Sequence, residues 1–537
     1  MSSSSEYSVP REANKLFVEG ILNNAHLAHL PAELKALGHI SALKALEATF
    51  LNLLLTKKYN IEPVKVKIDT DHASLFFMSP VITRYLKDGV PIPMSAFSPD
   101  LMKMIPSQDK HRSHASLHRR LATNIYKTKD GRYYHTHASM NPDPSLTALG
   151  LPLDGEEADT YDDVVQRIQK AVSEHNSTEL DELMNEKYRQ AGTIAYTSEE
   201  YFASEHGKAA GQAGLFEIAR DPKSQQAPSW WDDNASNPSS PRRPLAGLKV
   251  VDLARVIAAP SITRGLAEMG ASVMRVVSPH VTDLTPVLQD LNWGKWTAFL
   301  HLKDEADKEK LRALIREADV VVDGYRPGVM ERLGFGREAV FDLVRGRSRG
   351  IIYVRENCYG WHGPWSHRSG WQQISDACCG VSKSYAEAMG VAGAVTPVFP
   401  NSDYCTGVYA VDVSLNYYSQ WLVRSCGTYP KNVWDEVWTR HGSPKFQHYH
   451  AMPYLIPAML KILHEHDAKV LFNPDFFEQR VSKVLDTTFI QVKPIAQFPG
   501  GEVELKYTVG TRGNGVDEPV WPEDLTVETV AAVASKA

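Results

Sequence analysis

The distribution of apolar and polar positions changes character after residue 244. From there on, short apolar runs alternate with stretches of helical periodicity. A run of this kind is typical of a buried strand, and an amphipathic stretch is typical of a surface helix. The strand candidates are 248–256, 271–278, 296–302, 319–325 and 349–357, and the helix candidates are 260–270, 304–318 and 336–346. Strands that alternate with helices predict a parallel sheet with right-handed crossovers, and hence an α/β fold.

The part of the chain before residue 244 is less regular. Residues 42–55 are rich in Ala and Leu and predict a buried helix. Residues 161–185 predict a second helix, and 130–141 predict a glycine turn followed by a short strand. The division that we expect is a polar tail (1–15), an N-terminal region (16–228), a Ser-, Asn- and Pro-rich linker (229–243), a parallel-sheet core (244–430) and a C-terminal region (431–537).

Composition narrows the classes of function. The chain has 537 residues, 43% of them hydrophobic, with a formal net charge of −6. This balance gives no reason to expect a nucleic-acid partner or an anionic membrane surface. No apolar run is long enough to span a bilayer, and the first residues have no apolar leader segment. An odd cysteine count without zinc-type spacing favours a reducing compartment, so we expect a cytoplasmic protein; these are Cys358, Cys378, Cys379, Cys405 and Cys426.

The sequence does not assign a role to two pairs of side chains. His135 and His137 are two residues apart on a predicted strand and so face the same side, but no metal site is expected from them. Trp230 and Trp231, inside the predicted linker, either anchor it to a domain of this chain or contact a partner.

Four segments of the second half carry a resemblance to a known family. They are PLAGLKVVDLARVIAAPSITRGLAEMGASVMRVV (244–277), the stretch 292–336 with its YRPGVMERLG motif, GPWSHRSGWQQISDACCGVS (363–382) and NSDYCTGVYAVDVSL (401–415). In this order they resemble the CaiB/BaiF proteins, which are family III of the CoA-transferases and are related to formyl-CoA transferases and α-methylacyl-CoA racemases. Residues 126–152 and 41–60 resemble later parts of the same module. We therefore interpret the chain as a front-truncated module fused to a second one, with an unrelated N-terminal domain as the alternative.

The resemblance implies that Asp403 is the catalytic residue. In the family, an aspartate at this place attacks an acyl-CoA thioester and forms a covalent intermediate. Asp403 precedes YCTGVYAVDVSL, which we interpret as a helix, and a helix N-terminus would keep the pKa of the carboxyl group low. The alternative is that Asp403 only caps that helix.

The same blocks imply residues that hold CoA. By position, Lys295 and Arg332 match basic residues of the family's CoA site, Tyr325 matches an aromatic one, and Val256 lies in the turn that lines the CoA groove. Arg326 adds a possible bidentate contact to phosphate. The competing interpretation for each cation is a solvated helix or loop end.

Three positions depart from the family's best-known pocket. Ile257 stands where formyl-CoA transferases have a glutamine, and Trp371 and Gln372 replace a Tyr-Glu pair. These changes argue against an oxalate-type substrate. In the racemases a histidine lies at the position of Trp371, and tryptophan cannot act as a base, which disfavours racemisation unless another histidine enters the site.

The resulting prediction is a Rossmann-like α/β core with a second, smaller α+β domain of the family III type. We expect CoA transfer between an acyl-CoA and a carboxylic acid, with CoA as substrate and without a tightly bound cofactor or a metal. The family implies a homodimer. The alternatives are another acyl-CoA-transforming enzyme on the same fold, such as a racemase, lyase or hydrolase, and a non-catalytic descendant that binds a ligand or a partner.

Overall fold

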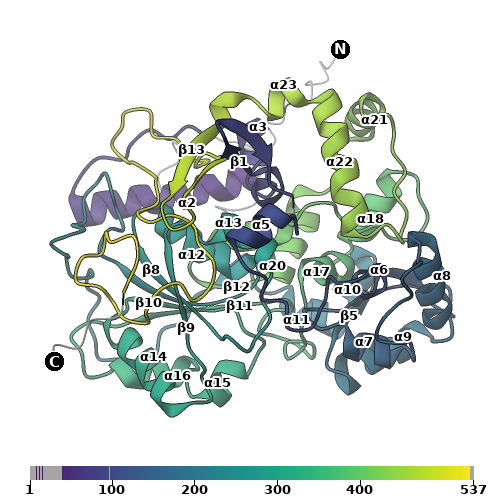
Figure 1. Ribbon diagram of the computed structural model, residues 1–537, viewed down its shortest axis with the longest axis horizontal. Helices are drawn as coiled ribbons and strands as arrows, with labels where there is room; N and C mark the ends of the chain where they lie inside the picture. The colour runs from purple at the N-terminus through teal and green to yellow at the C-terminus, as the bar shows by residue number, and fades with distance from the viewer. Residues whose placement is uncertain (1–7, 9–10, 12–14, 16–38, 96, 532–537) are drawn as a thin grey trace.

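The computed structural model describes residues 8, 11, 15, 39–95 and 97–531. Its centre is a seven-stranded sheet in the order β6-β12-β11-β10-β7-β8-β9 (Figure 1). Every pairing in it is parallel except that of the edge strand β6. The α/β fold with a parallel sheet is therefore confirmed. The strands are β6 (Phe216–Glu217), β7 (Lys249–Leu253), β8 (Ser272–Val277), β9 (Lys295–Phe299), β10 (Val320–Asp323), β11 (Ile352–Asn357) and β12 (Asp412–Ser414).

Both faces of this sheet are buried, which explains the nearly continuous apolar runs in its strands. Neighbouring residues of one strand point to opposite faces, so that Val250 joins one core cluster and Val251 the other. Helix α12 (Ala258–Glu268) covers the first face, and α14 (Glu305–Glu317) and α16 (Arg337–Val344) cover the second. The predicted helices and strands from 248 to 357 all occur, with ends shifted by a few residues.

Two smaller antiparallel sheets flank the central one. The first contains β3 (Asn124–Lys127), β4 (Tyr133–His137) and β5 (Ala191–Ile194), and α8 (Tyr161–Val172) packs on it. The second has the order β13-β14-β1-β2, with β13 (Phe477–Ser482), β14 (Thr487–Val492), β1 (Arg84–Lys87) and β2 (Val90–Pro93). In it, Arg84 lies opposite Ile490, so strands from the two ends of the chain form one sheet.

Two predicted helices differ from the structure. Residues 404–415 were expected to be one helix, and this is wrong: α19 (Asn401–Thr406) ends early, and β12 then pairs with β11 and β6 in the central sheet. Burial of β12 between two strands outweighs the helical preference of the segment. The helix expected at 161–185 is interrupted after Val172, because Asn176 begins the new helix α9 (Ser177–Glu182), whose Glu179 accepts a hydrogen bond from the Asn176 backbone N–H at 3.0 Å.

The predicted linker is fixed to this chain through one of its two tryptophans. Trp231 Nε1 donates to the Ala246 carbonyl at 2.8 Å, and the Lys58 ammonium group lies 3.6 Å from the Trp231 ring centroid. Lys58 lies near the end of α2 (His39–Tyr59), the helix predicted at 42–55. The domain limits drawn at 229–243 and at 431 stay predictions.

The remaining helices complete the chain. No helix of the described residues is both long and apolar enough to cross a membrane. The helices not yet named are α3 (Thr70–Ser74), α4 (Ser79–Ile82), α5 (Pro99–Met104), α6 (Leu117–Leu121), α7 (Asp143–Ala148), η2 (Leu183–Lys187), α10 (Ser198–Ala203), α11 (Glu205–Ala210), α13 (Thr285–Leu291), α15 (Val329–Leu333), α17 (Gln372–Cys378), α18 (Val381–Ala388), α20 (Leu415–Trp421), η3 (Leu422–Cys426), α21 (Lys431–Arg440), α22 (Met452–His466), α23 (Ala468–Leu471) and η4 (Pro474–Phe476).

Candidate active site

The strand order of the central sheet has a topological switch point between β7 and β10, and the region beyond the carboxyl ends of these two strands is called the crevice below. The chain proceeds from β7 outward through β8 and β9, then returns to β10 on the other side of β7. In open parallel sheets, ligands bind at such a switch point, beyond the carboxyl ends of the strands. Val256 and Ile257 follow β7, and Tyr325 and Arg326 follow β10, so the fold brings four of the predicted residues to this crevice.

Close packing fixes the two chain segments that enter the crevice. A Cβ atom on Gly324 would lie 2.6 Å from the Cβ of Ala259, so only glycine lets the end of β10 pass so near the start of α12. A Cβ on Gly407 would likewise lie 1.6 Å from Ser261 Oγ. The second contact holds α19, which carries Asp403, directly against α12.

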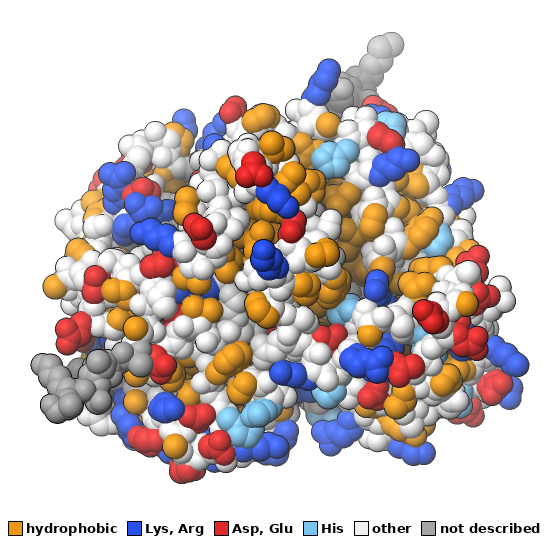
Figure 2. Space-filling model, viewed as in Figure 1, with side chains coloured by type: hydrophobic (Ala, Val, Ile, Leu, Met, Phe, Trp, Pro, Cys, Tyr) orange, Lys and Arg blue, Asp and Glu red, His pale blue; other side chains and the backbone are white. Residues whose placement is uncertain are grey.

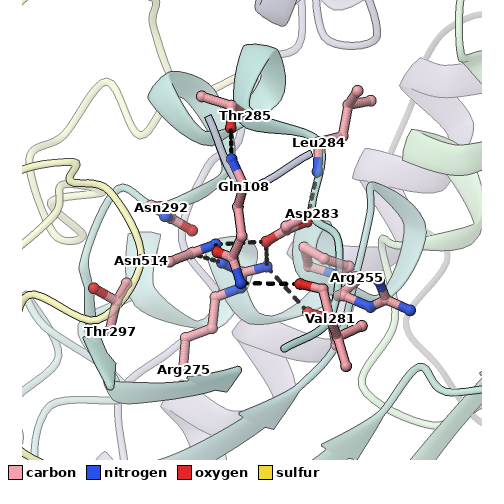
Figure 3. Close-up of polar contacts among 12 residues, drawn as sticks. Gln108, Arg255, Arg275, Val281, Asp283, Leu284, Thr285, Asn292, Thr297 and Asn514 are labelled. Atoms are coloured by element: carbon pink, nitrogen blue, oxygen red, sulfur yellow. Dashed lines mark hydrogen bonds and ion pairs between the residues drawn. The ribbon is translucent and has the colours of Figure 1, made fainter. Parts of the chain in front are cut away.

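A buried polar network holds the loop that follows β8 (Figure 3). Asp283 accepts hydrogen bonds from Arg275 at 2.7 Å and from Asn514 at 2.8 Å. Gln108 Nε2 donates to the carbonyls of Ser278 and Val281 at 2.8 and 2.9 Å. The N-terminal region, the sheet core and the C-terminal region therefore all contribute to this one loop.

Three arginines gather at the crevice beside that loop. Arg255 donates to the carbonyl of Thr282, and its guanidinium group lies 5.5 Å from the ring centroid of Tyr325. Arg326 donates to the carbonyl of Arg189 at 3.4 Å. Partial removal from water and the nearby positive charges of Arg255 and Arg189 lower the pKa of Arg326. None of the three forms an ion pair with a carboxylate of the described chain, so together they offer a site for an anion.

The other two predicted basic residues lie in different environments. Arg332 is exposed on α15. Its guanidinium group lies over the loop that follows β10, since a Cβ on Gly328 would lie 3.0 Å from Arg332 Nη1. Lys295 has no exposed surface: its ammonium group donates to Asp252 at 3.0 Å and to the Pro260 carbonyl at 2.8 Å, and burial lowers its pKa to about 8. A phosphate contact needs an exposed cation, so the structure does not support that role for Lys295 and places it beneath the first turn of α12.

Asp403 lies within the first turn of α19, at its third residue. The residue that caps α19 is Pro400, and no described side chain bonds to the free N–H groups of the helix, so the interpretation of Asp403 as its cap is wrong. The carboxyl group is half-buried, and no described residue donates a hydrogen bond to it or forms an ion pair with it. A carboxyl group that is withdrawn from water without a partner is costly, which is typical of a functional position.

The pKa of Asp403 contradicts the sequence-based expectation. Burial, followed by the negative charge of Asp376, raises this pKa to about 8, whereas the helix N-terminus was expected to keep it low. The reason is that α19 has only six residues and its dipole is weak, while removal from water acts on the whole charge.

Asp376 is held firmly, in contrast to Asp403. It accepts hydrogen bonds from Ser402 at 2.5 Å, from Gln372 at 2.7 Å and from Ser419 at 3.2 Å. Gln372 is thus one of the predicted pocket residues that the structure places beside the candidate site, where it is buried and orients Asp376.

Trp371 connects the site to the N-terminal region. Its ring stacks on His137 with centroids 5.4 Å apart, and its Nε1 donates to Ser139 Oγ at 3.0 Å. The Ser139 N–H donates to His137 Nδ1, so the proton lies on Nε2 and points to the Gln373 amide oxygen. Burial lowers the pKa of His137 to about 3. A histidine does approach the position of Trp371, but its nitrogens are occupied and it is not placed as a base.

Aromatic and other apolar side chains also pack around α19. The ring of Phe399 packs on Phe77 with centroids 6.2 Å apart, and Phe76 meets Tyr404 edge-on at 5.4 Å. Figure 2 shows hydrophobic side chains gathered in a hollow between α22 and α5. The N-terminal region therefore supplies part of the apolar packing around α19, the helix that carries Asp403.

Sequence reasoning missed two acidic residues at the carboxyl ends of β10 and β11. Asp323 and Glu356 line a cavity of about 260 Å³ together with Tyr325, Gly328 and Trp361. Glu356 and the buried Val354 are two residues apart on β11 and therefore point to the same face of the sheet. An acidic residue near the carboxyl end of a buried strand indicates a functional position, and this could have been recognised from the sequence. Arg189 was also missed, and nothing in its local sequence distinguishes it from a surface arginine.

Several known proteins are similar to this chain. Residues 245–418 match the family described as "CoA-transferase family III". The "Acetyl-coenzyme A transferase nodX" of Hypoxylon pulicicidum is 55% identical over 99% of this chain and 96% of its own length. An "Acyl-CoA transferase" of Gibberella moniliformis is 36% identical over 64% of this chain and 59% of its own length.

A solved structure is also similar, a CAIB/BAIF family protein from Brucella suis. It is 20% identical, with a TM-score of 0.29 over 37% of this chain and 60% of its own length. The relative from Hypoxylon pulicicidum, which matches nearly the whole chain, decides the classification. The chain belongs to CoA-transferase family III, and its activity is that of a CoA-transferase.

Proposed function

We propose that this enzyme transfers CoA between an acyl-CoA and a carboxylic acid through a covalent intermediate on Asp403. The observation that carries the proposal is the state of the Asp403 carboxyl group, which is half-buried, has no partner among the described residues and lies on α19, the helix packed against α12. A nucleophile needs a free pair of electrons directed at the substrate, and a carboxylate already engaged in hydrogen bonds would have to give them up first.

The reaction then proceeds in balanced steps. An oxygen of Asp403 bonds to the thioester carbonyl carbon, the C–S bond breaks, and CoA leaves as thiolate. The thiolate attacks the aspartyl carbonyl of the mixed anhydride and releases the first acid as carboxylate. The acceptor carboxylate next attacks the aspartyl-CoA thioester, which releases the thiolate and forms a second mixed anhydride. The thiolate finally attacks the acceptor acyl carbon of this anhydride and releases Asp403 as carboxylate. No proton is gained or lost overall.

The first test is direct trapping. The Hypoxylon relative is named an acetyl-CoA transferase, so acetyl-CoA is the first donor to examine. Incubation with acetyl-CoA and hydroxylamine should convert Asp403 to a hydroxamate, which peptide mass spectrometry would locate. Modification of a different residue, or turnover without any trapped residue, would contradict the covalent route.

The cluster of Arg189, Arg255 and Arg326 is where we expect the phosphate groups of CoA to bind. We expect Arg326→Ala to raise KM for acyl-CoA by about 10-fold to 100-fold with little change in kcat, because a charge-assisted hydrogen bond contributes about 1.5–3 kcal/mol. Steady-state kinetics would measure this effect. An acyl-pantetheine donor, which lacks the nucleotide, should show no difference between the variant and the parent enzyme.

Arg312 offers the matched control for Arg326. It is an arginine on the outer helix α14, paired with Glu305 and Glu309 at 2.7 and 3.0 Å. Arg312→Ala should leave KM within about twofold, since exposed ion pairs contribute little. An equal rise of KM in both variants would remove the phosphate role from Arg326.

The raised pKa of Asp403 predicts how activity depends on pH. We expect kcat/KM to rise roughly tenfold per pH unit between about pH 5.5 and 7, because only the ionised carboxylate attacks and the folded-state pKa is raised to about 8. Asp376→Asn removes the negative charge that helps to raise this pKa, so the whole rising limb should move to lower pH. A flat profile in the parent enzyme, or an unmoved limb in the variant, would contradict the assignment.

The surroundings of Asp403 favour an acyl group without a second charge. The charged group that shifts its pKa is another carboxyl, Asp376. The rings of Phe76 and Phe77 pack on Tyr404 of α19 and on Phe399, which precedes this helix. A dicarboxylate would need a cation at this place. Racemisation is disfavoured because His137 is not placed as a base. A homodimer and a cytoplasmic location remain part of the proposal, and light scattering and imaging of a tagged protein would test them.

A further inference from the structure

Glu356 is a second unusual carboxyl group at this site. Among the buried aspartates and glutamates of the described chain, it alone has no hydrogen-bond or ion-pair partner for its side chain. Asp323, for example, accepts from the Tyr325 N–H and the Tyr353 hydroxyl, and Asp290 is paired with Arg264. The exposed fraction of Glu356 is 9%. Burial of a charge without a partner costs several kcal/mol, so a neutral, protonated Glu356 is the form that the fold tolerates.

Glu356 lies where its carboxyl proton can face a bound substrate. Glu356 is the penultimate residue of β11, at the carboxyl edge of the sheet, and it lines the cavity of about 260 Å³ with Asp323 and Tyr325. The adjacent Arg355 does not neutralise it, because Arg355 pairs with Asp412 of β12 and lies 4.1 Å from the Trp361 ring centroid.

Only acidic groups act on Glu356 from the neighbouring elements. Burial, the charge of Asp403 and the charge of Asp323 raise its pKa to about 8. Helix α12 also packs on β11, but its Arg264 and Glu268 are engaged with Asp290 and with the Tyr507 hydroxyl. The remaining titratable groups around the cavity are Tyr325, Glu331 of α15, Arg355 and His367.

We propose that Glu356 is a second functional carboxyl group of this enzyme, which stays protonated while Asp403 is ionised and donates a hydrogen bond to the carbonyl oxygen of the bound thioester. This inference rests on the covalent role proposed for Asp403. As an Asp403 oxygen bonds to the carbonyl carbon, the electron pair of the C=O double bond moves to the oxygen, where the Glu356 O–H stabilises it. Glu356 keeps its proton, and the pair returns as the C–S bond breaks.

Two variants separate the donor from the charge. Glu356→Gln keeps an N–H donor but cannot ionise, and Glu356→Met keeps the length of the side chain without a donor. We expect Glu356→Met to lower kcat about 100-fold, the usual effect of removing one such donor, while KM for acetyl-CoA stays within about threefold. Glu356→Gln should keep kcat within about fivefold of the parent enzyme.

The pH profile gives a readout that a merely structural role would not move. In the parent enzyme, kcat/KM should fall above about pH 8 as Glu356 ionises, and Glu356→Gln should lack this falling limb. Glu331→Gln, an exposed glutamate on the wall of the same cavity, is the matched control and should keep both limbs. An unchanged kcat in Glu356→Met, or a falling limb retained in Glu356→Gln, overturns the proposal.

Hydroxylamine trapping distinguishes this proposal from the one on which it rests. In Glu356→Met, Asp403 should still be modified, but about 100-fold more slowly than in the parent enzyme. Trapping at an unchanged rate overturns the role of Glu356 and leaves Asp403 as the nucleophile. Absence of trapping in the parent enzyme overturns the covalent route and, with it, the role of Glu356. Thermal unfolding of each variant confirms that it is folded.

Discussion

Replacement of Asp403 by asparagine is expected to lower kcat for CoA transfer by about 10⁴-fold, the scale of effect seen when a covalent nucleophile is removed. Asparagine has nearly the same shape, so the packing of α19 against α12 should persist. Its amide nitrogen carries no charge and its oxygen is a poor nucleophile, so no aspartyl intermediate can form. Steady-state rates with acetyl-CoA and hydroxylamine trapping would both measure the loss.

The stability of this variant should rise or stay unchanged. Within the described part of the chain the Asp403 carboxyl group has no partner to lose, and its burial makes its negative charge costly. Asp162→Asn is a suitable control, because Asp162 also lies in the first turn of a helix, α8, but is exposed. Full activity in Asp403→Asn, or an equal loss in Asp162→Asn, would show that Asp403 is not the nucleophile.

Replacement of Asp290 by alanine should give the largest loss of stability. Asp290 accepts from Arg264 at 2.5 Å, from Tyr404 at 2.6 Å and from Ser79 at 2.9 Å, and only 2% of it is exposed. Removal of one partner leaves the buried guanidinium group of Arg264 uncompensated, which costs about 3–5 kcal/mol. Denaturant unfolding, with the transition followed by two probes, would measure the change in the free energy of unfolding.

This prediction also concerns the site, because Tyr404 directly follows Asp403 in α19 and Ser79 belongs to the N-terminal helix α4. Asp435→Ala is the control, since Asp435 forms an exposed pair with Lys431 at 2.6 Å and should change stability by less than about 0.5 kcal/mol. Equal stabilities of the Asp290 and Asp435 variants would mean that the buried network contributes nothing net.

The sequence predicted some parts of the site better than others. Val256 and Tyr325 follow the carboxyl ends of two strands, β7 and β10. Parallel strands end at the same edge of their sheet, so the sequence predicted that both residues lie at the crevice. Lys295 could not be judged in this way. Its position at the start of β9 is compatible with both an exposed and a buried ammonium group, and only the contact with Asp252 decides between them.

The amino-acid sequence by itself determined the α/β core and the position of Asp403 along the chain. Both depend on local information: the alternation of apolar runs with amphipathic stretches, and four motifs in a family's order. Only the tertiary structure decided the chemistry of the site. It joined strands from the N-terminal and C-terminal regions, brought Arg189 to Arg326, and left Glu356 and Asp403 without partners among the residues that the structure describes. The pKa of a carboxyl group depends on its removal from water and on charges that are distant in sequence, and neither quantity is encoded in a local pattern.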